Sequence, residues 1–266
     1  AEATRESSAD FASMIIENLK KAGVQNTVKN ERLTFETLEP FAGTWIHAAG
    51  TYIEADGTSK RVAVSLGPEH GTIGPEQVKE AAKEAVQGIG YDLLILCGFS
   101  FDPHVSEEAK RYGKLTILVT RMNPDLAMGD ELLKKTGTGN LFMVFGEPDL
   151  EVTKAKDGTL TVEVRGVDVY DPTTGQIRNS STDDIACWSL ATSYDGESFF
   201  VRHAYFTGAD EPYEKLKRAL KAEVDEAAWA SLYSTKSRPF PKPASGKIAV
   251  KVINHYGDEV LKVLPV

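Results

Sequence analysis

The amino-acid sequence predicts a mixed α/β fold followed by a β-rich region, on three observations. Residues 91–101 (YDLLILCGFSF) form the most continuous apolar run, and their length and aliphatic content are typical of a strand buried on both faces. A helix-forming run at 75–87 precedes this strand, and a short helical segment at 106–112 follows it. After residue 140 the pattern changes to short apolar runs separated by turns. We therefore expect two domains, 1–140 and 141–266.

The first elements follow from periodicity and from chain breakers. Residues 11–22 place their apolar side chains near one helical face and end at Gly23, which predicts an amphipathic helix. Residues 33–38 fit either a short strand or a continuation of that helix. Two runs separated by Asp56 and Gly57, at 45–53 and 60–66, predict a hairpin.

The alternation of strands and helices then predicts a central sheet flanked by helices. Its neighbouring strands, at least partly parallel, are expected at 62–66, 93–99 and 115–119. In the second half, the turn signal at 156–158 joins two hairpin strands. Further strands are expected at 185–190, 198–206, 247–253 and 259–263, and helices at 212–222 and 226–232. The segment 237–245 contains three prolines and is expected to be extended and exposed.

Composition limits the class of protein. The chain has 266 residues, 41% of them hydrophobic and 26% charged, which is ordinary for a globular protein. No apolar run reaches the roughly 20 residues that span a bilayer, and residues 1–10 lack the apolar core of a signal peptide, so we expect a cytoplasmic protein with no membrane partner. The first residue is Ala and not Met, which leads us to expect processing or a piece of a longer chain.

The net charge of −9 argues against nucleic-acid binding by the whole surface, but charge is unevenly distributed. Residues 231–257 contain no Asp or Glu and five basic residues: Lys236, Arg238, Lys242, Lys247 and Lys251. These are the first candidates for contacts with DNA phosphates, against the alternatives of a solvated linker or a packing arm. The second candidate is His70, in a glycine-rich loop between a strand and a helix start, where an anion can bind, although a plain loop is the default.

No motif for catalysis or metal binding stands out. The five histidines are well separated, the two cysteines sit in apolar contexts that favour buried thiols, and Gly-x-Ser-x-Gly is absent. Arg202 and His203 fit a polar pair at a sheet edge better than a site. We therefore predict no catalytic residue, no metal and no cofactor in this chain.

Several long strings resemble the C-terminal region of site-specific, adenine-specific DNA methyltransferases of the type III restriction–modification kind. They are NLFMVFGEPD (140–149), VDVYDPTTG (167–175), DDIACW (183–188), ESFFVRHAYF (197–206) and RPFPKPASGKIAVKVINHYGDEVLKV (238–263), with WIHAAG (45–50) and MNPDLAMGDELLKKTGTGNLF (122–142) before them. The resemblance implies DNA as a partner, with a restriction subunit or a second copy of the chain as further partners.

The chain departs from that family at the catalytic motifs. The full-length methyltransferases use S-adenosylmethionine, which they bind through an FxGxG-type motif, and they position adenine with a DPPY-type motif. The nearest strings here, FAGTW at 41–45 and DPTT at 171–174, fail at required positions. We therefore expect a non-catalytic DNA-recognition or assembly domain.

The order of elements in the first half also resembles restriction-endonuclease-like nucleases. That family holds a divalent metal through an acidic residue on one strand and an E/Q-x-K motif on the next. Here the corresponding strand reads AVSLG at 63–67, which implies a degenerate, inactive version. The alternatives are a metal-dependent nuclease with a relocated site using Glu54, Glu69, Asp102 or His104, and a structural dimerisation module.

Overall fold

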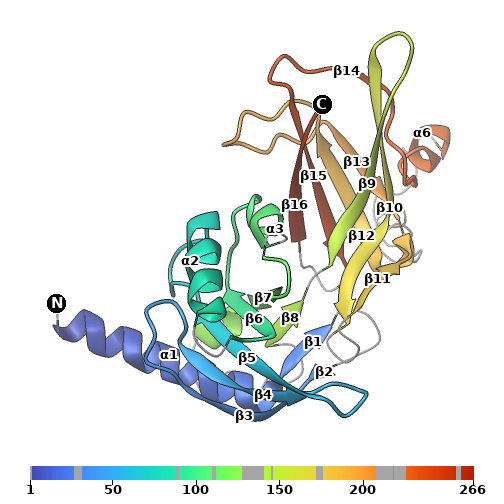
Figure 1. Cartoon of the computed structure of the whole chain (residues 1–266). Coiled ribbons are helices and arrows are strands. Elements are labelled where there is room, and N and C mark those ends of the chain that lie inside the picture. The colour runs from blue at the N-terminus through green and yellow to red at the C-terminus, as the bar shows by residue number, and fades with distance from the viewer. Residues whose placement is uncertain are drawn as a thin grey trace. The chain divides into compact units, whose positions relative to one another are not determined.

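The computed structural model describes residues 2–26, 32–87, 90–109, 112–127, 141–144, 146–171, 176–207, 218, 226–255 and 259–266 (Figure 1). The chain folds as a mixture of helices and sheets and divides into two compact units. The first contains Ala1–Phe145 and Tyr170–Ile177, and the second contains Gly146–Val169 and Arg178–Val266. None of the described helices is long and apolar enough to cross a membrane.

The first unit is built on an eight-stranded mixed sheet with the order β2-β1-β8-β7-β6-β5-β4-β3. Its described elements are α1 (Glu2–Ala22), β1 (Val24–Asn26), β2 (Arg32–Leu33), β3 (Phe35–Pro40), β4 (Ala48–Ile53), β5 (Ser59–Leu66), α2 (Pro75–Val86), β6 (Leu93–Gly98), α3 (Val105–Ala109), β7 (Thr116–Met122), the 3-10 turn Pro124–Ala127 and β8 (Phe142–Val144). The residues at 33–38 therefore belong to strands, and α1 starts earlier than the sequence predicts.

The centre of this sheet confirms the predicted parallel strands. β6 pairs in parallel with β5 on one side and with β7 on the other, and all six residues of β6 are buried. A strand covered on both faces can be apolar at every position, which explains the uninterrupted run in the sequence. The predicted hairpin is also confirmed, because β4 pairs antiparallel with β5, and β3 extends the sheet beyond it.

Helices cover both faces of the sheet, as the alternation of side chains along the strands requires. Val62 and Val64 share a core with apolar residues of α1, whereas Ala63 between them faces α2. α1 ends at Gly23, where φ is +67° and a Cβ atom would lie 2.3 Å from the carbonyl oxygen of Leu33. The left-handed conformation and the close strand thus both require glycine at this position.

The second unit consists mainly of two antiparallel sheets. Its described elements are β9 (Glu147–Lys154), β10 (Thr159–Asp171, whose last residues fall in the first unit), β11 (Gln176–Ser180), the 3-10 turn Thr182–Asp184, β12 (Ile185–Ala191), β13 (His203–Phe206), α6 (Glu226–Ala230), β14 (Phe240–Pro241), β15 (Lys247–Asn254) and β16 (Glu259–Pro265). One sheet has the order β11-β10-β14 with β9 also on β10, and the other has the order β13-β12-β15-β16.

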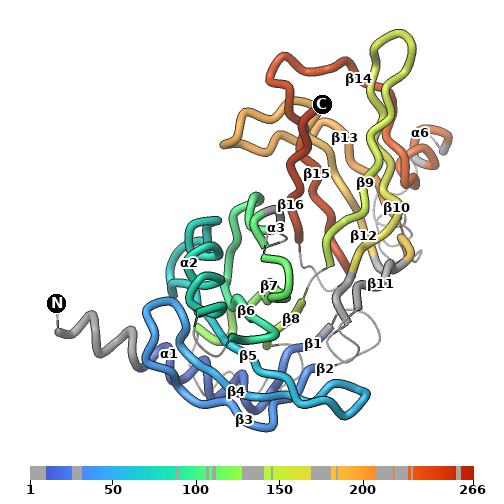
Figure 2. Tube along the Cα trace, viewed as in Figure 1, coloured from blue at the N-terminus to red at the C-terminus, as the bar shows by residue number. Residues whose placement is uncertain are grey.

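Residues 233–241 bridge the two sheets. The predicted proline-rich segment, 237–245, is extended and largely exposed as expected, with two buried exceptions. On one side this segment bonds to β10, with Ser237 N donating to the Val162 carbonyl at 2.8 Å. On the other side the Trp188 indole donates to the Ser234 carbonyl at 2.8 Å. Ser237 and Phe240 are buried, at 5% and 4% exposure. The backbone runs extended (Figure 2), forms a bridge to β13 at Tyr233, and pairs with β10 at Phe240, while the two buried side chains anchor it to the second unit.

Other expectations have mixed outcomes. The hairpin with its turn at 156–158 and the closing strands β15 and β16 are confirmed. The strand expected at 198–206 starts only at His203, because the residues before it form a loop. The predicted helix at 212–222 lies outside the described residues, apart from residue 218. Both cysteines are free thiols, and burial raises the pKa of Cys97.

Candidate nucleic-acid interface

Lys236 and Arg238 are held by the body of the second unit. The Lys236 ammonium lies 3.8 Å from a carboxylate oxygen of Glu163 on β10. The backbone N–H of Arg238 donates to the Tyr205 hydroxyl at 2.7 Å, and its guanidinium donates to Ser231 Oγ at 2.7 Å. Both side chains reach the surface, but each already has a polar partner, so a phosphate would have to compete for it.

Lys251 is the most enclosed of the predicted contacts. It lies on β15, and its side chain is only 26% exposed. The ammonium sits 3.3 Å from Glu259 on the neighbouring β16 and 5.2 Å from the centre of the Phe199 ring. An ion pair with a carboxylate and a cation–π contact already satisfy this charge. Lys251 is therefore the weakest candidate among the five for a phosphate contact.

Lys242 and Lys247 differ from the other three. Both are exposed, and neither forms an ion pair with any residue in the part of the chain that the structure describes. Lys242 follows β14, and Lys247 begins β15 with its backbone N–H bonded to Ser245 Oγ at 3.4 Å. The five predicted cations therefore do not act as one group, and these two are available to an outside ligand.

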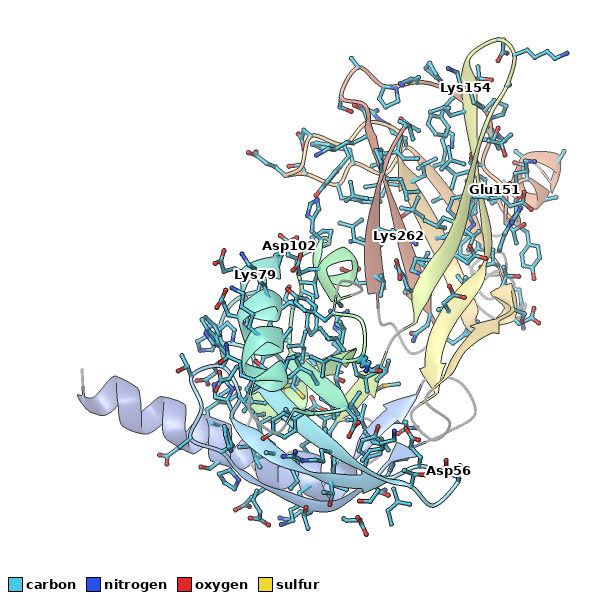
Figure 3. All side chains as sticks on the ribbon, in the orientation of Figure 1. Asp56, Lys79, Asp102, Glu151, Lys154 and Lys262 are labelled. Carbon is cyan, nitrogen blue, oxygen red and sulfur yellow. The ribbon has the colours of Figure 1, made fainter. Side chains whose placement is uncertain are left out.

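The strand register places three loops of the second unit at one end, which we call the loop end: residues 154–158, 192–202 and 242–247. The start of β15 and the end of β12 meet there, since Ala191 pairs with Ala249. The start of β10 joins them, because Thr159 pairs with Pro241. Figure 1 shows the β9–β10 turn at the same end of this unit as the loop before β15, and Figure 3 places Lys154 near that turn.

The loop end adds three exposed basic residues, Lys154, Lys156 and Arg202, to the predicted Lys242 and Lys247. Three exposed carboxylates accompany them, from Asp157, Asp195 and Glu197. Five cations against three carboxylates make this end net positive in a chain whose total charge is −9. The missed residues are up to 93 positions from Lys247 in sequence, so only the strand pairing brings them together.

Two of these carboxylates serve the loops themselves. Hydrogen bonds from the Thr159 side chain and backbone lower the pKa of Asp157, and backbone hydrogen bonds from Ser198 and Glu197 lower the pKa of Asp195. Each therefore stays ionised and fixes a turn by accepting bonds from nearby donors. Both keep their negative charge, so they reduce the positive charge of the loop end but do not cancel it.

His70, the remaining predicted contact, belongs to the first unit. It follows β5, its ring is 88% exposed, and Nε2 lies 4.0 Å from a Glu69 oxygen. The loop around it packs against the loop after β6, where Ile73 N donates to the Ser100 carbonyl at 3.0 Å. The next helix, α2, begins at Pro75, and its N-cap residue Gly74 has no side chain that could cap it. His70 is accessible, but it shares no element with the basic residues of the loop end.

The residues considered for a relocated nuclease site do not all converge. Asp102 accepts a hydrogen bond from His104 Nδ1 at 2.9 Å. Glu54 lies in the β4–β5 turn, next to Asp56, which Figure 3 shows far from Asp102 within the first unit. Glu69 is at the other end of β5 from that turn. Among the described residues no three His, Cys, Asp or Glu side chains come together in a way that could hold a metal ion.

Two histidines outside the predicted set have lowered pKa values. Burial lowers the pKa of His47, against the opposing effect of Glu84, and its Nδ1 accepts a hydrogen bond from Leu66 N at 3.1 Å. Burial and then the nearby Arg238 charge lower the pKa of His203. The His203 ring packs edge-on against Tyr205 and Phe240, and its buried Nδ1 has no hydrogen-bond partner among the described residues. Both rings are neutral near pH 7 and act as packing groups.

Comparisons with known proteins return no match: no protein-family model, no curated protein and no solved structure matches this chain.

Proposed function

We propose that this chain is the non-catalytic DNA-recognition domain of a site-specific DNA adenine methyltransferase of the type III restriction–modification kind. The main observation that supports this proposal is the loop end. Lys242 and Lys247 have no ion-pair partner there among the described residues, and three further exposed cations lie on the same end. The strings quoted above, above all 197–206 and 238–263, connect this end to that family because they contain the loop at 242–247 and the second half of the loop at 192–202.

The electrostatics favour a polyanion at the loop end over the rest of the surface. Lysine and arginine on neighbouring loops neutralise phosphates along a backbone and release condensed counterions, which supplies most of the non-specific affinity for DNA. The net charge of −9 repels DNA elsewhere. A protein with this distribution binds DNA with one defined end, which is what a recognition domain requires.

The architecture of the first unit is consistent with a restriction-endonuclease-like scaffold that has lost its site. The order α1-β3-β4-β5-α2-β6, with β5 and β6 parallel, supports this proposal. Ser65 on β5 is fully buried and lies between buried apolar neighbours, where that family places metal-binding side chains. A serine and aliphatic side chains are poor ligands for Mg²⁺, so this unit supports the fold and does not cleave DNA.

The catalytic chemistry belongs to the remainder of such a methyltransferase, which binds S-adenosylmethionine. This chain supplies target recognition, in the cytoplasm, where bacterial and archaeal DNA is found. An assembly role, through a second copy of the chain or a restriction subunit, is the alternative within the same proposal.

A fluorescence-anisotropy titration with a labelled mixed-sequence duplex at low and moderate salt tests the proposal. Binding that weakens steeply as salt rises supports DNA recognition. Absence of binding at low salt, together with a stable dimer in sedimentation, would move the proposal to the assembly role. Nicking of a plasmid only when Mg²⁺ is added would instead favour a nuclease.

A further inference from the structure

The loop at 192–202 exposes two apolar side chains at the loop end. Phe200 is 63% exposed and Val201 is 58% exposed, the two largest values among the large hydrophobic side chains of the described residues. The neighbouring Phe199 behaves differently, because it packs against the buried cluster of Ala191, Tyr194 and Ala249. The loop therefore uses one aromatic ring as an anchor and presents the next one to solvent.

The loop is fixed at several points along its length. Asp195 Oδ1 accepts hydrogen bonds from the backbone N–H groups of Glu197 and Ser198, at 2.9 and 3.0 Å. Arg202 N donates to the Leu190 carbonyl at 2.9 Å, and Tyr194 N donates to the Lys247 carbonyl at 3.0 Å. A ligand that meets Phe200 and Val201 therefore meets a loop that is already ordered, so little conformational entropy is lost on binding.

The surroundings of this tip indicate the chemistry of its partner. Arg202 directly follows the two apolar residues, and Lys242 and Lys247 lie on the adjacent loop. Two apolar side chains are far too small a patch for a stable protein interface, which buries about 800 Å² on each partner. Asp195 and Glu197 are exposed on the same loop, but the loop end as a whole carries more cations than carboxylates. A small apolar tip at a net positive end matches stacked bases flanked by phosphates, and many DNA-binding proteins insert an apolar wedge between base pairs.

We propose that Phe200 and Val201 form an apolar wedge that enters a base step of duplex DNA, while the cations of the loop end hold the flanking phosphates. This inference rests on the proposed function and adds a mode of contact to it. Insertion partly unstacks one step, and contact of the Phe200 ring with an exposed base face offsets the cost of unstacking.

A duplex with 2-aminopurine at several adenine positions tests the wedge, because this base fluoresces more strongly when it is unstacked. The whole 266-residue chain is titrated with this duplex, and anisotropy of a terminal dye reports affinity in parallel. Wild type should raise the 2-aminopurine signal. The double variant F200A/V201A should lose that rise and bind about tenfold more weakly, with an unchanged dependence on salt, because an apolar contact releases no counterion.

The variant I53A is the matched control, because Ile53 is also an exposed aliphatic side chain, at 49%, but lies in the first unit. It should behave as wild type in both readouts. Thermal unfolding of F200A/V201A should also match wild type, since neither side chain is buried.

The outcomes separate the wedge from the proposed function. If F200A/V201A keeps both the 2-aminopurine signal and the affinity of wild type, the wedge is overturned and DNA recognition stands. If wild type does not bind the duplex at all, the proposed DNA contact fails, and the wedge with it. Binding to phosphatidylserine vesicles that depends on Phe200, without duplex binding, would overturn the wedge in favour of a membrane contact.

Discussion

Two halves of one basic segment have different roles in the second unit. Lys236 and Arg238 lie in the part that bridges the two sheets, where a carboxylate and hydroxyl groups already engage them. Lys242 and Lys247 lie only a few residues later, on the loop end, and neither pairs with a described acidic residue. In the sequence all four residues lie in one stretch, 231–257, that contains no Asp or Glu, so local charge does not distinguish the two pairs.

This difference shows that a run of basic residues in the sequence does not by itself form a binding surface. Two features of the fold determine whether such residues can bind an anion: whether each charge already has a partner within the protein, and whether other loops place further cations nearby. Strand pairing supplies a partner for Lys236 and brings Lys154 and Lys156 toward Lys242. Three experiments test whether the two pairs of basic residues differ in this way.

The largest effect is expected from the half of the segment that is built into the core. Replacing Phe240 by Ala removes a ring that is 4% exposed and packs against His203. We expect F240A to lower the free energy of unfolding of the second unit by about 3 kcal/mol. Urea denaturation followed by tryptophan fluorescence measures this change. F200A is the control and should change stability by less than about 0.5 kcal/mol; equal effects would contradict the packing described here.

A smaller effect is expected from removing charges at the loop end. The variant K242Q/K247Q should reduce the slope of log affinity against log salt for a DNA duplex by roughly 1.8, because two phosphate contacts are lost. We expect the affinity itself to fall about tenfold at moderate salt, by the same counterion argument. Anisotropy titrations at several salt concentrations measure both quantities.

The matched control for those charges is K236Q/R238Q, which removes the same number of positive charges from the same segment. Its slope should stay close to that of wild type, because both side chains already have partners within the protein. Equal slopes for the two double variants would mean that the segment binds DNA through overall charge, without the distinction drawn here.

The smallest effect is expected from acidification. The pKa of His203 is lowered in the folded protein, mainly by burial, so the unfolded chain binds a proton more readily. The stabilisation from this ring is therefore complete above its unfolded pKa of about 6.5 and is lost as the pH falls through the lower folded value. His203→Phe keeps the aromatic packing and should flatten the loss of stability of the second unit between pH 7.5 and 5. Thermal unfolding across that range measures it, and an unchanged pH dependence would exclude His203 as a contributor.

The first unit could be predicted well because its signals are local. The run at 93–98 is buried on both faces, and the helix at 75–86 has its apolar residues on one side. The length of the apolar run and the spacing of the apolar residues are therefore sufficient to predict these two elements. Gly23 ended α1 as expected, because a left-handed turn is required there. These features depend on neighbours in the sequence.

The second unit was harder because its decisive contacts are distant in sequence. Phe240 pairs with Leu160, and Trp188 bonds to Ser234, at separations that no periodicity reports. The sequence predicts the exposure of the proline-rich segment correctly, but it does not reveal that two of its residues, Ser237 and Phe240, are buried. The sequence indicates Arg202 only as part of a polar pair at a sheet edge and gives no signal for Lys154 and Lys156, since only the strand register shows that they share one end with Lys247.

The most direct test of the account is hydrogen–deuterium exchange of the intact chain with and without a DNA duplex, read by mass spectrometry at short labelling times. Binding should slow exchange in the three loops at 154–158, 192–202 and 242–247, and should leave residues 233–240 unchanged. Slowed exchange at 233–240 or at 67–74, with the three loops unaffected, would contradict the claim that the loop end of the second unit contacts DNA.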